Sequence, residues 1–250
     1  MPPECGFSFS AISTQILPLL TPSWMLPRIA GTFLCVWGTW LDMARIRMKS
    51  PRDCGSWERE IRGNHDKAAS GVMDADDFNP VAKAAVDWTQ SELLPEHLQW
   101  LTNLPQGPLT TNGIVLVHGA VHDEDEYVFT PAQALEGLLD TNAQVTFFGH
   151  THHQGGFAHE GSNLEVLQIR PRASESFTAL RVEPGRHYLL NPGSVGQPRD
   201  SDPRAAFAIS DLEHETVEFW RVKYDIAAVQ ERMREVDLPE PLVQRLVLGR

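Results

Sequence analysis

The sequence has few cysteines, no long apolar run and no cluster of basic residues, and each absence argues against a class of protein. Its three cysteines lie in the first 54 residues, without the spacing of a zinc site or a disulfide framework. No uncharged stretch of about 18 residues is apolar throughout, so we expect no membrane span, with a signal anchor in residues 11–44 as the alternative. The net charge of −12 argues against duplex nucleic acid as a partner, because its phosphates are bound by clustered Lys and Arg.

Charge, cysteine and tryptophan are distributed unevenly along the chain. Residues 1–55 hold five basic and three acidic residues, a net charge of +2, so the remainder carries −14. The same segment holds all three cysteines and three of the seven tryptophans. We therefore expect an anomalous segment at 1–55 that is not part of the fold, and one folded domain at 56–250. The ordinary content of hydrophobic (42%) and charged (22%) residues fits a soluble protein, for which we expect a cytoplasmic location.

From residue 61 onward, the hydrophobic pattern predicts mixed helices and strands. Asn79 and Pro80 form a helix start before residues 81–94, and further helices are expected from residue 95 and at 131–139 and 226–236. Strands are expected at 113–117, 143–148, 164–169, 178–182 and 187–190, followed by a hairpin of 205–209 with 216–222. There are no repeats, and the mixture predicts a layered α/β fold.

Three histidine-bearing motifs each follow an apolar segment. They are GNHD at residues 63–66, HG at 118–119 and GHTH at 149–152. Loops that follow strand ends are where α/β folds bind their ligands. Residues two apart in extended backbone point the same way, so we expect His150 and His152 to face one site. Imidazole and amide groups suit Mn, Fe, Zn or Ni better than calcium. Each of the six other histidines is interpreted as structural or solvent-exposed.

In this order the motifs resemble those of the calcineurin-like metallophosphoesterases, over residues 61 to about 250. The resemblance extends to the loop NPGSVGQP at 191–198, which Arg199 follows, and to the segment DLPE at 237–240. It points to a small bacterial branch that includes predicted phosphodiesterases and relatives of dinucleoside tetraphosphate hydrolases. The fold that it implies is an α/β sandwich layered α-β-β-α, with the N-terminal β-α-β unit missing or scrambled in this chain.

The resemblance implies a metal-binding role for four residues. Asn64, His118 and His150 would hold one metal ion, and His152 would help to hold a second. The cofactors would thus be two divalent metal ions, drawn from Mn, Fe, Zn, Ni and Mg. In a two-metal mechanism, the ions activate a water molecule and offset charge on the phosphoryl oxygens.

The resemblance also implies the catalytic group and the reaction. His65 would donate a proton to the leaving oxygen or steady the phosphate, and Asp66 would orient it. The expected activity is hydrolysis of a phosphate ester, as a phosphodiesterase or phosphatase, on a phosphorylated small molecule or nucleotide. The alternative is a non-catalytic interaction module on the same fold. The segment 121–129 follows His118 and either shapes the pocket or, with its acids at 123–126, forms a solvated loop.

Two motifs of the family are missing before residue 63: an Asp-x-His, and a Gly-Asp whose carboxylate bridges the metals. If each codon is read two bases later, residues 10–26 permit SDIHANLAALDAVLDA and residues 35–50 permit CLGDLVGYGPDPNEV. Four positions in this shifted frame are fixed whatever the codons, and all fit the family: Asp over Trp24-Met25, Gly over Trp37-Gly38, Gly over Met43-Ala44 and Glu over Met48-Lys49. We therefore hypothesise that residues from about 4 to 55 are an out-of-frame translation, and that activity is impaired in the chain as written.

Overall fold

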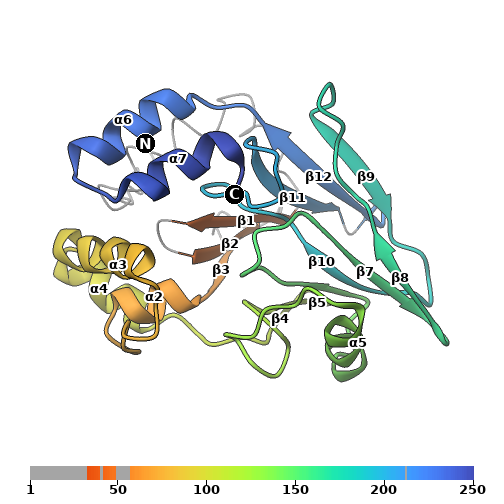
Figure 1. The fold of residues 1–250 in the computed structure, drawn as a ribbon. Helices are drawn as coiled ribbons and strands as arrows, with labels where there is room; N and C mark the ends of the chain where they lie inside the picture. Colours follow the sequence, from red (N-terminus) through yellow and green to blue (C-terminus); the bar gives the residue numbers. More distant parts are fainter. Residues whose placement is uncertain (1–32, 40–41, 49–56, 212) are drawn as a thin grey trace, which may run out of the picture.

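The strands of the protein form two six-stranded sheets (Figure 1). The structure is a computed structural model that describes residues 33–39, 42–48, 57–211 and 213–250. The first sheet is antiparallel throughout and has the strand order β3 (Trp57–Ile61), β2 (Asp42–Met48), β1 (Phe33–Thr39), β11 (Ala205–Asp211), β12 (Thr216–Val222) and β9 (Phe177–Arg181).

The second sheet is mixed and carries three parallel strands in its centre. Its strand order is β4 (Leu109–Thr111), β5 (Ile114–Leu116), β6 (Val145–Phe147), β10 (His187–Asn191), β7 (Gly155–Glu160) and β8 (Asn163–Leu167). Strands β5, β6 and β10 run parallel to one another, and the other pairs are antiparallel. The carboxyl ends of these three strands therefore meet at one edge of the sheet.

The main hydrophobic core lies between the two sheets. Ile61 and Phe219 of the first sheet and Phe147 and Leu190 of the second belong to one cluster and are fully buried. Burial of such side chains contributes about 1.5 to 3 kcal/mol each. This core holds the two sheets face to face as a sandwich.

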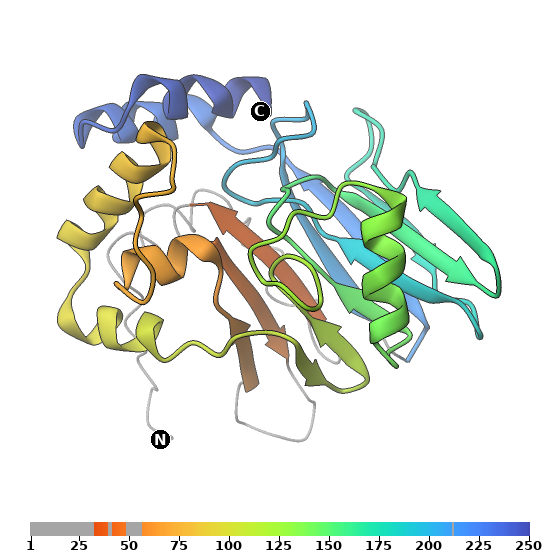
Figure 2. The same cartoon turned by 60° about the horizontal axis from the view of Figure 1, so that its bottom comes forward.

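Helices cover the outer sides of the sandwich (Figures 1 and 2). Helix α5 (Pro131–Asp140) packs on the second sheet, where Ala134 and Leu138 share a core with Val115 and Leu189. The remaining helices are α2 (Asn64–Ala69), α3 (Pro80–Glu92), α4 (Pro95–Thr102), α6 (Ile226–Glu235) and α7 (Glu240–Leu248). A separate apolar cluster joins α6 and α7 to α3 through Val81, Ala85 and Trp88.

The layered α/β sandwich expected from the sequence is confirmed, as are the helix starting after Asn79 and the hairpin of β11 with β12. Of the segment 1–55, the structure describes β1 and β2, which form a hairpin within the first sheet. The rest of that segment, including most of the suggested signal anchor, lies outside the described residues, and the boundary at residues 55/56 stays a prediction. In the part of the chain that the structure describes, no helix is long and apolar enough to span a membrane.

Candidate metal and catalytic site

Two histidine motifs meet because they follow neighbouring parallel strands. His118 comes two residues after β5 and His150 three residues after β6, at the shared carboxyl edge. Nε2 of His118 lies 3.0 Å from Nδ1 of His150, and both side chains are buried. This placement is consistent with the prediction from the sequence that the two motifs share one site.

The third motif, GNHD, follows strand β3 of the first sheet. Strand β3 ends at Ile61, and α2 begins at Asn64 directly afterwards. Oδ1 of Asn64 lies 3.2 Å from Nε2 of His118. Nε2 of His118 therefore lies within hydrogen-bonding distance of the other two groups, and we call these three residues the donor cluster: Asn64, His118 and His150.

The GHTH segment does not adopt the extended backbone that we expected. His150 and His152 both have φ of 59°, in the left-handed region. The segment is a tight turn, because the amide of Gly149 donates to the carbonyl of His118 and Asn191 donates from Nδ2 to the carbonyl of Gly149 and to Oγ1 of Thr151. The expectation of extended backbone was wrong because hydrogen bonds from β10 compete successfully with continuation of the strand.

His152 is held by the loop that follows β10. Its Nδ1 lies 3.0 Å from the carbonyl oxygen of Gln197, and its own carbonyl accepts a hydrogen bond from the amide of Arg199. Since a carbonyl only accepts, the proton of the neutral ring is on Nδ1 and its lone pair is on Nε2. This tautomer is the one in which Nε2 can bind a metal ion.

His65 and Asp66 lie in the first turn of α2. The His65 ring meets the edge of Phe78 with ring centroids 5.0 Å apart, and His65 lines a cavity. Asp66 is fully buried, and its Oδ2 accepts a hydrogen bond from the amide of Gly63 at 2.8 Å. Asp66 therefore fixes the start of the helix that carries Asn64 and His65. Its suggested role in orienting His65 stays a prediction.

A partly buried ion cluster attaches α2 to the loop after β5. Glu124 accepts hydrogen bonds from Arg62 at 2.8 Å and Lys67 at 3.0 Å, and Lys67 also pairs with Asp125. Burial raises the pKa of Glu124, but the hydrogen bonds and charges of Arg62 and Lys67 outweigh it and leave that pKa below its ordinary value. Of the acids at 123–126, Glu124 is thus a structural group that fixes Asn64 relative to His118.

The same loop supplies an aromatic residue to the site. The ring of Tyr127 stacks on the ring of His150, with centroids 3.8 Å apart, and Tyr127 lines the cavity. Of the two interpretations of the segment 121–129, the structure therefore favours the one in which the segment shapes the pocket. Within this segment, Tyr127 itself was not predictable, because its contact with His150 depends on how the loop folds back.

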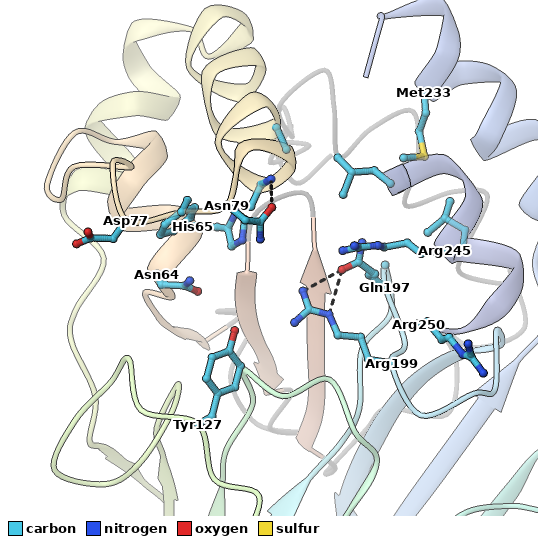
Figure 3. Close-up of a pocket in the computed structure, with 16 residues that line it drawn as sticks. Asn64, His65, Asp77, Asn79, Tyr127, Gln197, Arg199, Met233, Arg245 and Arg250 are labelled. Carbon is cyan, nitrogen blue, oxygen red and sulfur yellow. Dashed lines mark hydrogen bonds between the residues drawn. The ribbon is translucent and has the colours of Figure 1, made fainter. Parts of the chain in front are cut away.

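The cavity beside the donor cluster has a volume of about 440 Å³. One wall comes from α2 and α3 and contains Asn64 and His65, as Figure 3 shows. The opposite wall comes from the loop after β10 and from the C-terminal helices. The sequence did not predict that these segments line the site. This wall contains Gln197, Arg199, Met233, Leu242, Arg245, Leu246 and Arg250.

The fold and the site together define a protein of the metallophosphoesterase fold class, since a histidine cluster lies at the strand ends of a two-sheet α/β sandwich. The family model described as the calcineurin-like phosphoesterase superfamily domain matches residues 58–215, and the chain belongs to this superfamily.

Three relatives are consistent with this membership. A metallophosphoesterase structure from Sphaerobacter thermophilus is 37% identical, with a TM-score of 0.63 and 76% of each chain covered. A hypothetical protein from Pyrococcus horikoshii is 19% identical and shares the fold, with a TM-score of 0.58, 76% of this chain covered and 72% of that one. An uncharacterized protein of Methanocaldococcus jannaschii is 28% identical over 80% of this chain and 82% of its own length.

The donor cluster fits a divalent transition metal by the chemistry of its atoms. Across the described part of the chain, no three His, Cys, Asp or Glu side chains gather as a metal site. The atoms that converge are instead two imidazole nitrogens and the oxygen of Asn64, all three of which are neutral donors that Mn, Fe, Zn or Ni accept. Members of the superfamily generally use divalent metal ions, and these residues are compatible with one.

Proposed function

We propose that the protein hydrolyses a phosphate ester, as a phosphodiesterase or phosphatase, at the donor cluster. The observation that carries the proposal is that Nε2 of His118 lies 3.0 Å from Nδ1 of His150 and 3.2 Å from Oδ1 of Asn64, beside a cavity that Asn64 and His65 line. Membership of the superfamily supports a phosphoester as the substrate. The substrate class is a phosphorylated small molecule or nucleotide.

In this proposal Asn64, His118 and His150 hold one divalent ion and His152 helps to hold a second, with Mn, Fe, Zn, Ni and Mg as candidates. Bound divalent ions would supply Lewis acidity and lower the pKa of a bound water toward neutrality. The protein fixes the ligands beforehand: the Gln197 carbonyl sets the tautomer of His152, and α2 presents Asn64 to His118.

His65 acts on the substrate itself. It lies next to Asn64 on α2 and lines the cavity, so it is close to a phosphate bound at the donor cluster. Its imidazole would donate the proton to the leaving oxygen, a step typically worth about 10²- to 10⁴-fold in rate. Contact with the edge of Phe78 restricts the ring, which reduces the entropy lost on reaching the reactive orientation.

The test is hydrolysis of bis(p-nitrophenyl) phosphate with and without Mn²⁺. We expect Mn²⁺-dependent release of p-nitrophenol, lowered about 100-fold or more in kcat by His65→Ala. His97→Ala is the matched control, because His97 lies on α4 outside the cavity lining, and it should retain activity. Metal-dependent turnover that His65→Ala leaves unchanged would refute the role of His65. If neither the chain as written nor a chain with a restored N-terminal reading frame hydrolyses the diester, a non-catalytic interaction module is favoured.

We also propose that residues from about 4 to 55 are an out-of-frame translation, and that the chain as written is impaired. The shifted frame permits both missing family motifs, whose carboxylates would complete the two-metal site. Sequencing codons 1–65 tests this directly: the shifted frame either spells both motifs or spells neither. Where it spells them, the repaired protein should hydrolyse the same diester faster than the chain as written. The proposed location is the cytoplasm, with no membrane or duplex nucleic-acid partner.

A further inference from the structure

The cavity extends well beyond the space that one phosphate occupies. Its volume of about 440 Å³ is in the range of pockets that bind organic ligands of some size. Asn64 of the donor cluster and His65 line one end of the cavity. The wall built by α7 and the loop after β10 lies opposite, and its residues 233–250 are outside the region matched by the family model.

This opposite wall carries a concentration of positive charge. Arg199, Arg245 and Arg250 all line the cavity. Figure 3 shows the guanidinium groups of Arg199 and Arg245 turned toward the space between α3 and α7, with Arg250 nearer the edge. Asp77 is the acidic residue of the lining, and it lies at the far rim, turned away from the arginines (Figure 3).

These three arginines lack the carboxylate partner that six of the other described arginines have. The described partner of Arg199 is the neutral side chain of Gln197, which accepts from Nε at 3.1 Å and from Nη2 at 2.9 Å. Among the described residues, no carboxylate forms an ion pair with Arg199, Arg245 or Arg250, whereas Arg62, Arg186, Arg204, Arg221, Arg232 and Arg234 each have one. The wall therefore has uncompensated charge.

Of the three arginines, Arg245 is the one whose surroundings most disfavour the charged form. It is half-buried, and burial together with the neighbouring charge of Arg199 lowers its pKa from the ordinary value. Two like charges beside each other in a cavity are unfavourable until an anion enters between them. A guanidinium fork matches phosphate or carboxylate oxygens, and two forks on one anion give several charge-assisted hydrogen bonds.

Six apolar side chains also line the cavity, together with the polar Asn79 and Gln197. Phe78, Ala82 and Ala85 line it from the α3 side, and Met233, Leu242 and Leu246 line it from α6 and α7. An inorganic anion would leave this apolar surface uncovered. An organic group between two anionic ends would cover it while placing one anion at the donor cluster and the other at the arginines.

We infer that the cavity has a second anion subsite, formed by Arg199 and Arg245, and that the substrate carries a second phosphate or carboxylate joined to the scissile phosphate through an organic group. The inference rests on the proposed function, because it takes the donor cluster as the place of the scissile phosphate. It deepens that function by assigning the substrate class: a bis-anionic organic phosphate ester such as a nucleoside bisphosphate.

The experiment is isothermal titration calorimetry on the full chain with adenosine 3′,5′-bisphosphate and adenosine 5′-monophosphate in the presence of Mn²⁺, with chromatography after each titration to establish that the ligand is intact. The wild type should bind the bisphosphate at least about tenfold more tightly than the monophosphate. Arg245→Gln should reduce this ratio to about one. Arg232→Gln is the matched control, because Arg232 is on α6, outside the cavity lining, and carries the same charge; it should keep the ratio.

Equal affinities for the two ligands in the wild type, no binding of the bisphosphate, or a ratio retained in Arg245→Gln would each overturn the inference. Thermal melts establish that each variant is folded, and Arg199→Gln replaces Arg245→Gln if the latter is not. Selective binding without hydrolysis of bis(p-nitrophenyl) phosphate by the repaired chain would refute the proposed function and leave the subsite standing. Hydrolysis without selective binding would do the reverse.

Discussion

Replacement of Arg221 by methionine should destabilise the protein severely, because Arg221 neutralises a buried carboxylate. The side chains of Arg221 and Asp200 are 0% and 1% exposed and form an ion pair. Arg221 also donates from Nε to Oε1 of Gln154, and Asp200 accepts from the amide of Gln154 at 3.0 Å. The pair thus connects β12 to the loop after β10 and to Gln154. This residue lies two residues after His152 and directly before β7.

The magnitude follows from what remains after the change. Methionine fills much of the arginine volume but leaves the Asp200 carboxylate buried with only the amide of Gln154 as a described donor. Removing one partner of a buried pair costs about 3 to 5 kcal/mol. Since domains of this kind have a total stability of about 5 to 15 kcal/mol, the loss is a large fraction of it.

The assay is urea unfolding at pH 7, followed by tryptophan fluorescence, which the seven tryptophans make sensitive. Arg232→Met is the control, because its ion pair with Glu235 is half-exposed and should contribute at most about 1 kcal/mol. A further change of Asp200 to asparagine in the Arg221→Met background should recover part of the loss, since it removes the buried charge. The reasoning is refuted if Arg221→Met costs less than about 1 kcal/mol, or if the double variant is no more stable than Arg221→Met alone.

Two further predictions concern pH. Glu124→Gln should cost about 1.5 to 3 kcal/mol at pH 7, because charged hydrogen bonds from Arg62 and Lys67 are lost. Since the folded pKa of Glu124 is lowered, the wild type should lose this contribution as the pH falls from about 5 to about 3, and urea unfolding at both pH values should show no such loss in the variant. Burial raises the pKa of Tyr224 to about 12, so wild-type stability should fall between about pH 10 and about pH 12, by at most about 3 kcal/mol. Tyr224→Phe should abolish that fall without destabilising the protein at pH 8, where the buried hydroxyl has no hydrogen-bond partner among the described residues; a parallel decline in both proteins would contradict this.

The parts of the fold that local sequence determines were predictable. The carboxamide of Asn79 accepts hydrogen bonds from two amides at the start of α3, and Thr130 forms a capping box with Gln133 at the start of α5. Strand β7 was missed because it begins with two glycines and lacks clear alternation. The reason for one of them is tertiary: a Cβ on Gly156 would lie 2.4 Å from the carbonyl oxygen of Leu189 in the adjoining strand β10.

The candidate site divides in the same way. The histidines of the donor cluster follow strands whose carboxyl ends meet, so order along the chain and strand direction suffice to bring them together. The left-handed turn at His150 and His152 was not predictable, because it depends on donation from Asn191, some forty residues away. Arg245 entered no sequence argument, since only the packing of α7 near α3 turns it toward His65.

The two walls of the cavity therefore carry different information about the protein. The wall with Asn64 and His65 lies within the region matched by the family model, and it supports phosphoester chemistry whatever the organic group of the substrate. The opposite wall combines Gln197 and Arg199, which lie within that region, with residues 233–250 of the C-terminal helices, which lie beyond it, so superfamily membership says nothing about the helical part of this wall. In the proposed complex, the charge and apolar surface of the second wall would contact parts of the substrate that do not react. Substrate choice in this protein is accordingly expected to depend on α6 and α7, and exchanging these helices should change which ester is preferred while leaving the donor cluster intact.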